Sequence, residues 1–320
     1  MSFELPPTPP VLKGRGKNPK SEIPNPKSDW VWNIDELDIE SMVVGDPAAE
    51  SADAETFSRI KCLHQCPLRY RYRYLQGIKE AFRSIESYLG NAVHDVLEWL
   101  YTERHRGREP EESAMLERFA AGWTENLDDR VAIVRVDDSE ESYLKTGREM
   151  LIRFFQETFA RDQSETVALE QRLSIRLSDA VVFTGFADRV GRTEKGRLFV
   201  IDYKTSKNEG DASEFSEGLQ APLYAACVLG DHGEEEALAG YHYLRHGTTR
   251  WQQVDRERAA QLLERFLDLA NEAAAEGEFP ARPGILCAWC GFNAQCPAAD
   301  VPDRFSGGLR RAERNGRRLL

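Results

Sequence analysis

Two carboxylates and a lysine near the middle of the chain have the spacing of a metal-ion site. Asp188 ends a strand-like stretch, and Asp202-Tyr203-Lys204 follows after a short turn-forming segment. Side chains along a strand alternate between its two faces, so Asp202 and Lys204 are expected on one side and Tyr203 on the other. Two carboxylates held close together repel each other unless a cation lies between them. The pattern therefore predicts a site for a divalent cation.

A predicted β-hairpin would bring these acids together. Apolar residues alternate along 181–188 and again along 198–202, which is typical of strands with one buried face. The intervening segment Thr193-Glu194-Lys195-Gly196 has the composition of a turn. If the two strands pair, Asp188 lies beside Asp202.

Such a site could hydrolyse a phosphodiester bond. The anionic oxygens of the phosphodiester repel an attacking water, and a divalent cation neutralises them and lowers the pKa of a bound water. Magnesium prefers oxygen ligands, which Asp188 and Asp202 provide. Lys204 would orient or help to deprotonate the water and stabilise negative charge in the transition state.

Further motifs flank this centre in a recognisable order. They are an opening stretch at 58–70, a helix start with a histidine at 90–97, a Gln-x-x-x-Tyr element at 220–224 and a cysteine cluster at 287–296. Together with Asp188 and Asp202-x-Lys204, this order resembles the RecB-like branch of the PD-(D/E)XK nuclease superfamily. The resemblance covers roughly residues 56 to 300. It implies an α/β fold, with a restriction-endonuclease-like core of a mixed central sheet flanked by helices and an inserted helical lobe.

The resemblance also implies roles for individual residues. It gives the metal a histidine nitrogen, two carboxylates and a backbone carbonyl as ligands, from His94, Asp188, Asp202 and Tyr203. It gives catalytic roles to Asp188, Asp202, Lys204, Glu170, Gln220 and Tyr224, with the last two contacting the scissile phosphate. Because imidazole suits manganese better than magnesium, activity with either Mg²⁺ or Mn²⁺ is expected.

Each of these assignments has a simpler structural alternative. Asp188, Asp202 and Lys204 could belong to a surface hairpin without a catalytic role. Glu170 could be a surface acid of an edge strand, and His94 could be a structural histidine. Gln220 and Tyr224 lie four positions apart, on one face of a helix, and could serve only to pack that helix.

Four of the six cysteines could hold a second metal centre. Cys287, Cys290 and Cys296 provide three thiolates, and a tetrahedral site needs a fourth. The resemblance assigns Cys66 as that ligand, with Cys62 as its competitor, while Cys227 is more typical of a core residue. The spacing fits zinc as well as iron–sulfur, and the resemblance favours a [4Fe–4S] cluster, as in AddB-type and CRISPR-adaptation nucleases. Such a centre would tie the two ends of the nuclease domain together.

The chain is expected to have three parts: a proline-rich and charged linker tail at 1–54, a nuclease domain at 55–300 and a basic tail at 301–320. Within the domain we expect a helical insert at about 107–163, a metal-site core at about 164–255 and the cysteine cluster at 287–296. Hydrophobic periodicity predicts helices at 83–106, 111–128, 140–162, 220–228 and 256–276. It predicts strands at 167–177, 180–190, 198–203, around 241–244 and at 251–254.

Composition limits the possible partners. The formal net charge of −12 argues against nucleic-acid binding over the whole surface. Basic residues nevertheless cluster at 59–83, where phosphate contact is expected, and at 310–318, where contact and simple solvation remain equally open. No apolar run reaches the roughly 20 residues that cross a bilayer, so a cytoplasmic protein without a membrane partner is expected. A Walker loop is absent from this sequence, so no helicase motor is predicted within it.

The leading hypothesis is a metal-dependent DNA nuclease, an exonuclease on single-stranded DNA or DNA ends in repair or recombination. One alternative is a CRISPR-adaptation nuclease that trims DNA. Another is a catalytically silent iron–sulfur subunit that binds DNA within a repair complex. A third is a subunit that cuts only with a helicase partner.

Overall fold

The computed structural model describes residues 54–135, 137–211, 213 and 218–298, together with the backbone of 309–314 and 317–318. The predicted linker tail at 1–54, apart from Ala54, lies outside the described residues. Of the predicted basic tail at 301–320, only the two short backbone segments belong to them.

A mixed six-stranded sheet carries the predicted hairpin. Its strands are β1 (Ala54–Glu55), β4 (Glu165–Arg176), β5 (Val182–Arg192), β6 (Leu198–Lys204), β7 (Glu236–Tyr243) and β8 (Thr248–Asp255). β4, β5 and β6 are antiparallel neighbours, β6 and β7 are parallel, and β7 and β8 are antiparallel. The parallel pair requires a crossover, which helix α6 (Gln220–His232) provides. Gly196 closes the β5–β6 turn with a φ of 79° that favours glycine.

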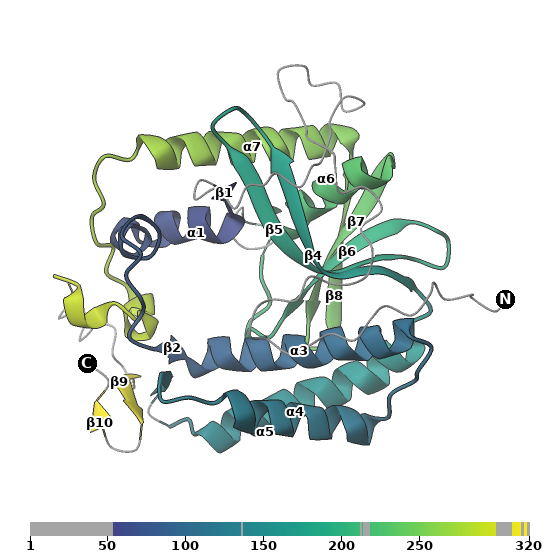
Figure 1. Cartoon of the computed structure of the whole chain (residues 1–320), viewed down its shortest axis with the longest axis horizontal. Helices are drawn as coiled ribbons and strands as arrows, with labels where there is room; N and C mark the ends of the chain where they lie inside the picture. The colour runs from purple at the N-terminus through teal and green to yellow at the C-terminus, as the bar shows by residue number, and fades with distance from the viewer. Residues whose placement is uncertain are drawn as a thin grey trace.

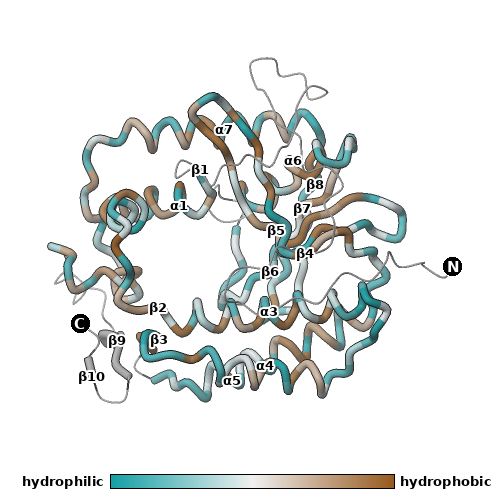
Figure 2. Tube along the Cα trace, in the orientation of Figure 1, coloured by the Kyte–Doolittle hydropathy of each residue, from teal (hydrophilic) through white to brown (hydrophobic). Residues whose placement is uncertain are grey.

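Helices cover both faces of this sheet (Figure 1). Helices α1 (Phe57–Gln65), α6 and α7 (Arg256–Ala275) pack on one face and share one core cluster with the strands. Helices α3 (Ile85–His105), α4 (Glu112–Asn126) and α5 (Glu140–Arg153) pack on the other face around a second cluster. Hydrophobic residues accordingly concentrate along the strands and on α6 between the two layers (Figure 2).

The predicted order of elements is confirmed within a few residues at each boundary. The helix expected at 140–162 is α5 followed by a π-helical turn (Phe154–Thr158) and a 3₁₀ turn (Phe159–Arg161). A second, small sheet was not predicted: it joins β2 (Arg83–Ser84), β3 (Val131–Arg135), β9 (Leu309–Arg314) and β10 (Arg317–Arg318). Its strands are too short to show a clear period in the sequence.

Candidate active site

Glu170 lies across from Asp188 where β4 and β5 pair, because the residues on both sides of them are partners in the register. Glu170 has a φ of 45°, and within the described residues it is the one non-glycine residue in the left-handed region. This conformation costs on the order of 1–3 kcal/mol and is found most often at functional sites. The strain therefore marks this position as one that does more than continue the strand.

The strands change phase at the same place. Ala168 and Leu173 pack in the α6–α7 core cluster although they are five positions apart, and Ala187 and Val190 do so three positions apart. Strict alternation would put residues at odd separations on opposite faces. The irregular backbone beside Glu170 accounts for this break in the alternation. It allows two successive residues of β5, Asp188 and Arg189, to face α3.

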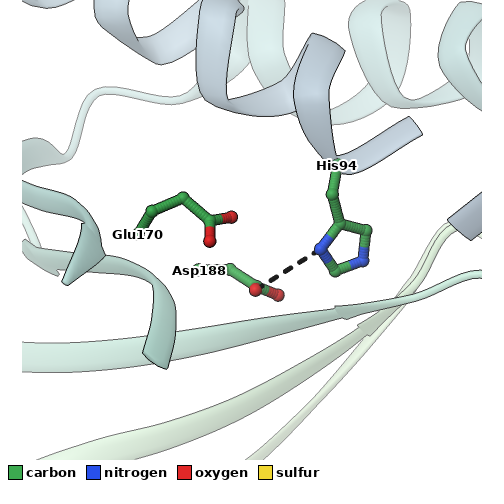
Figure 3. Close-up of side chains that lie close together, drawn as sticks. All are labelled: His94, Glu170 and Asp188. Carbon is green, nitrogen blue, oxygen red and sulfur yellow. Dashed lines mark ion pairs between the residues drawn. The ribbon is translucent and has the colours of Figure 1, made fainter. Parts of the chain in front are cut away.

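The first of these two residues, Asp188, meets a histidine from that helix. Ser84 caps α3 by accepting a hydrogen bond from the Ser87 amide, and His94 projects from the middle of the helix. Its Nδ1 lies 3.4 Å from Asp188 Oδ1, and potential ligand atoms of His94, Glu170 and Asp188 all lie within 4.8 Å of one another (Figure 3). A nitrogen and two carboxylate oxygens at this spacing could hold a divalent cation.

Hydrogen bonds from β6 complete the surroundings of this group. The Tyr203 amide donates to Asp188 Oδ2 at 2.7 Å, and the Tyr203 carbonyl lies 2.9 Å from His94 Nε2. Although burial lowers the pKa of His94, the nearby carboxylates, Asp188 first, raise it to about 9. Burial opposes ionisation of Asp188, but His94 and the Tyr203 amide hold its pKa below its usual range. Without a metal ion, the group is therefore an imidazolium facing an ionised carboxylate.

Asp202 and Lys204 form a second group on β6, on one side of the strand as predicted. Lys204 Nζ lies 2.5 Å from Asp202 Oδ2 and donates to Gln220 Oε1 at 3.0 Å. Burial raises the pKa of Asp202; Lys204 opposes this shift and Asp188 adds to it. Asp202 is thus close enough to Asp188 to affect it, but its carboxylate faces Lys204 and is outside the group of three potential ligands.

Helix α6 extends this second group through Tyr224. Gln220 Nε2 donates to the Tyr224 hydroxyl at 3.4 Å, and the Phe186 amide also hydrogen-bonds to Tyr224. Gly185 makes this approach possible, since a Cβ there would lie 2.4 Å from the Tyr224 ring. The predicted pair on one face of α6 therefore contacts both Lys204 and strand β5.

Lys61 is a site residue whose place the sequence did not reveal. In the sequence it belongs to the basic stretch at 59–83, yet from α1 its ammonium group is near enough to Lys204 and Asp202 for both charges to act on it. Burial and the Lys204 charge lower its pKa, and Asp202 opposes this shift. Several arginines of the same stretch are instead held by acids of this chain: Arg59 by Glu55, Arg69 and Arg73 by Glu80, and Arg83 by Asp128.

Arg189, the second residue of β5 that faces α3, ties the strand to the helical layer on that side. Its guanidinium is 2.7 Å from Asp162 and lies over the Tyr101 ring, 3.7 Å from the ring centre. The Tyr101 hydroxyl donates to the same carboxylate at 2.8 Å. This nearly buried network joins the helical layer to the residue next to Asp188.

The cysteine segment meets the chain near α1. Cys66 precedes the short helix α2 (Pro67–Tyr70). Cys287 lies in a 3₁₀ turn at Ile285–Trp289, Cys290 follows that turn, and Cys296 follows a second turn at Asn293–Gln295. The Ala81 amide donates to the Gly291 carbonyl at 2.9 Å, and the Tyr72 hydroxyl donates to the Gln295 carbonyl at 3.2 Å. These bonds hold the two distant segments side by side.

Within the described residues, no three cysteine sulfurs lie within 4.8 Å of one another, although the thiols are near enough to affect each other's pKa. Burial raises the pKa of Cys290 to about 11, and Cys66 contributes in the same direction. Burial also raises the pKa of Cys296, with further contributions from Cys287 and Cys66. Cys62 and Cys227 are buried in the protein core, whereas the other four cysteines are partly accessible.

Comparison with known proteins identifies the family. Residues 55–297 match the PD-(D/E)XK nuclease superfamily. The chain belongs to this superfamily. The predicted fold class, an α/β core with a mixed sheet flanked by helices, is therefore confirmed.

Two relatives come from streptococci. An ATP-dependent helicase/deoxyribonuclease subunit of Streptococcus agalactiae is 27% identical over 158 residues, 48% of this chain and 14% of that protein. Its counterpart from Streptococcus mutans is 30% identical over 99 residues, 31% of this chain and 9% of that protein. The chain thus matches a small part of these longer proteins.

Among solved structures, the crystal structure of SSO0001 is 16% identical. It covers 77% of this chain and 87% of its own, with a TM-score of 0.31. No helix within the described residues is long and apolar enough to cross a membrane.

Proposed function

We propose that this protein is a metal-dependent deoxyribonuclease that hydrolyses phosphodiester bonds, acting as an exonuclease on single-stranded DNA or DNA ends. The observation that carries the proposal is the convergence of His94, Glu170 and Asp188 within 4.8 Å, beside the Asp202–Lys204 pair. Membership of a nuclease superfamily supports the same reaction. Residues 55–300 would form the nuclease unit, with 107–163 as its helical insert, in a cytoplasmic protein.

The donor set suits a hard or borderline divalent cation such as Mg²⁺ or Mn²⁺. His94, Glu170 and Asp188 would hold it, with Asp202 and the Tyr203 carbonyl as further ligands. When bound, the cation would neutralise phosphate oxygens and lower the pKa of a water molecule.

The chain's own groups then have separate tasks. Lys204 would orient the attacking water and stabilise negative charge on the phosphate, because its ammonium group is positioned between Asp202 and Gln220. Gln220 would hold that ammonium group and, with Tyr224, contact the scissile phosphate. Tyr203 would orient both Asp188 and His94 through its backbone.

We also propose that Cys66, Cys287, Cys290 and Cys296 hold a [4Fe–4S] cluster, with zinc as the alternative. The hydrogen bonds that join the chain after Cys66 to the segment at 291–295 support a shared centre. The cluster would tie the chain near α1 to the segment after α7. The test is the metal content of protein purified without oxygen: about four iron atoms per chain support the cluster, and one zinc ion contradicts it.

A helicase partner is a further proposal. The relatives are described as part of a helicase and deoxyribonuclease, so this chain could act in DNA repair beside a motor protein. A nuclease that trims DNA in CRISPR adaptation and a catalytically silent protein that binds DNA remain the alternatives.

The deciding experiment is cleavage of end-labelled single- and double-stranded DNA with Mg²⁺ or Mn²⁺. Asp188→Asn should abolish cutting, because it removes charge at the centre of the ligand group. Glu149→Gln, a change at a residue with a 61% exposed side chain on α5, is the matched control and should cut like the wild type. Absence of metal-dependent cutting by the wild type on every substrate would contradict the proposed activity. Equal cutting by Asp188→Asn would contradict the assigned site.

A further inference from the structure

One exposed pair interrupts the otherwise covered β4–β5 ribbon. Phe186 is exposed, with 42% of its surface accessible, and it is the one exposed residue of β5. Its register partner on β4 is Arg172, which is the one exposed residue between Thr166 and Arg176. Partners in an antiparallel pair point to the same side, so an aromatic and a basic side chain leave the ribbon together at the surface.

This pair adjoins the proposed metal ligands. Ala187, between Phe186 and Asp188, packs in the α6–α7 core cluster, so its two neighbours leave β5 on the opposite face. Arg172 pairs with Phe186, and Glu170 lies across from Asp188, so all four side chains belong to that face. Two residues along a strand span about 7 Å. The next pair on this face, Ser174 and Thr184, is buried. On this face of the ribbon, the solvent-exposed pair Phe186 and Arg172 therefore lies directly beside the ligand group, and the pair beyond it is covered.

The backbone of Phe186 is hydrogen-bonded to the group formed by Tyr224, Gln220 and Lys204. The Phe186 amide hydrogen-bonds to Tyr224, which accepts from Gln220, which in turn accepts from Lys204. Gly185 lies directly against the Tyr224 ring. The exposed ring is thus placed on a fixed support connected to the residues that would contact the scissile phosphate.

An exposed aromatic ring beside a cation suits an unpaired nucleotide. Bases of single strands stack on aromatic side chains whatever their sequence, whereas a base in a duplex must first leave its stack. Arginine adds a charge for the phosphate and a plane for the base. A single exposed phenylalanine is in itself common on protein surfaces. This one is distinguished by an arginine across from it and by the ligand group two residues along its own strand.

We propose that Phe186 and Arg172 form a nucleotide subsite that selects single-stranded DNA. Phe186 stacks on the unpaired base next to the scissile phosphate, and Arg172 pairs with an adjacent phosphate. The inference rests on the proposed nuclease function, because it assigns the substrate class of that same site.

The test is equilibrium binding of fluorescein-labelled single-stranded oligonucleotides and blunt duplexes by the full chain, with Ca²⁺ as the cation. Phe186→Leu removes the ring and keeps the bulk, so single-strand affinity should fall by roughly fivefold to a hundredfold. Phe186→Trp keeps an aromatic ring and should bind single strands about as tightly as the wild type. Duplex affinity should be the same for all three proteins. Trp251→Leu, which removes an exposed aromatic side chain on β8, should bind like the wild type.

Abasic substitutions locate the contact. Removing the base at one nucleotide should weaken binding to the wild type and leave binding to Phe186→Leu unchanged, while removal elsewhere should affect both proteins equally. Arg172→Gln should make the slope of log K against log salt shallower by about 0.7, the value for one phosphate contact on a single strand.

The inference is overturned if Phe186→Leu binds single strands like the wild type, or if its loss is equal on duplexes and at every abasic position. Failure of the proposed function is a separate result. A wild type that cuts no DNA with Mg²⁺ or Mn²⁺ but shows the single-position abasic effect would retain the subsite and lose the activity.

Discussion

Lowering the pH should weaken metal binding, because a proton and a metal ion compete for His94. The imidazole lies between two acceptors, Asp188 and the Tyr203 carbonyl, and its pKa is raised to about 9. A raised pKa means that the proton is held over the whole neutral range and leaves only as the pH approaches 9. A metal ion that binds a ring nitrogen must displace that proton.

The magnitude follows from the competition. Protonation of His94 divides the apparent affinity for the metal ion by the factor 1 + 10^(pKa − pH). With a pKa of about 9, this factor is roughly 300 at pH 6.5 and roughly 4 at pH 8.5. The apparent Kd for Mn²⁺ should therefore fall by roughly 75-fold across this interval. Asp188 adds little to this change, because its pKa is held below its usual range and the carboxylate is already ionised.

Isothermal titration with Mn²⁺ under nitrogen measures both the affinity and the protons released. At pH 7, about one proton per metal ion should appear when buffers of different ionisation heats are compared. His94→Gln should bind more weakly and with little pH dependence, while His64→Gln, at an exposed residue of α1, should keep the wild-type behaviour. A wild-type Kd that stays constant between pH 6.5 and 8.5, with no proton release, would refute His94 as a ligand.

Three further predictions concern Lys204, Arg189 and the cysteine cluster. Lys204→Met should lower the cleavage rate by about 100- to 1000-fold with DNA affinity nearly unchanged, measured by single-turnover cleavage and by binding; equal turnover would exclude Lys204 from catalysis. Arg189→Met should lower the free energy of unfolding in urea by about 3–5 kcal/mol because Asp162 loses its nearly buried partner, whereas Lys145→Met, in an exposed ion pair, should change it by about 0.5 kcal/mol or less. Comparable losses in these two variants would contradict that reasoning. Cys290→Ser should remove the brown colour that the proposed iron–sulfur cluster would give, and it should lower the melting temperature; absorbance and thermal unfolding measure these two effects. A colourless wild type that contains zinc would contradict the cluster.

Much of the architecture could be predicted because its signals are local. Alternating apolar residues indicated β5 and β6, and the segment at 193–196 indicated the turn that pairs them. The spacing of Asp202 and Lys204 correctly predicted that both side chains share one side of β6. These features depend on periodicity and turn composition, which a single sequence displays.

Other features depend on contacts between distant segments. The left-handed backbone at Glu170 has no local signal, since glycine or asparagine would be the expected residue for that conformation. Lys61 resembled its basic neighbours, and only the packing of α1 brings it toward Asp202. The arginines at 59, 69, 73 and 83 resemble a phosphate-binding stretch, yet all four pair with acids. Glu55 and Glu80 are near them in the sequence, and only Asp128, the partner of Arg83, comes from a distant segment.

The two halves of the candidate site differ in how they tolerate the absence of a metal ion. Asp188 receives a backbone hydrogen bond and faces a protonated His94, so its negative charge is balanced before any cation binds. Asp202 is buried and relies on Lys204, and its pKa is raised. A metal ion that binds as proposed would displace the His94 proton, and it would replace one positive charge with two in a region that already accommodates one. On the proposed function, a cation would therefore enter a group whose Asp188 charge is already balanced, and its added charge would mainly favour ionisation of Asp202.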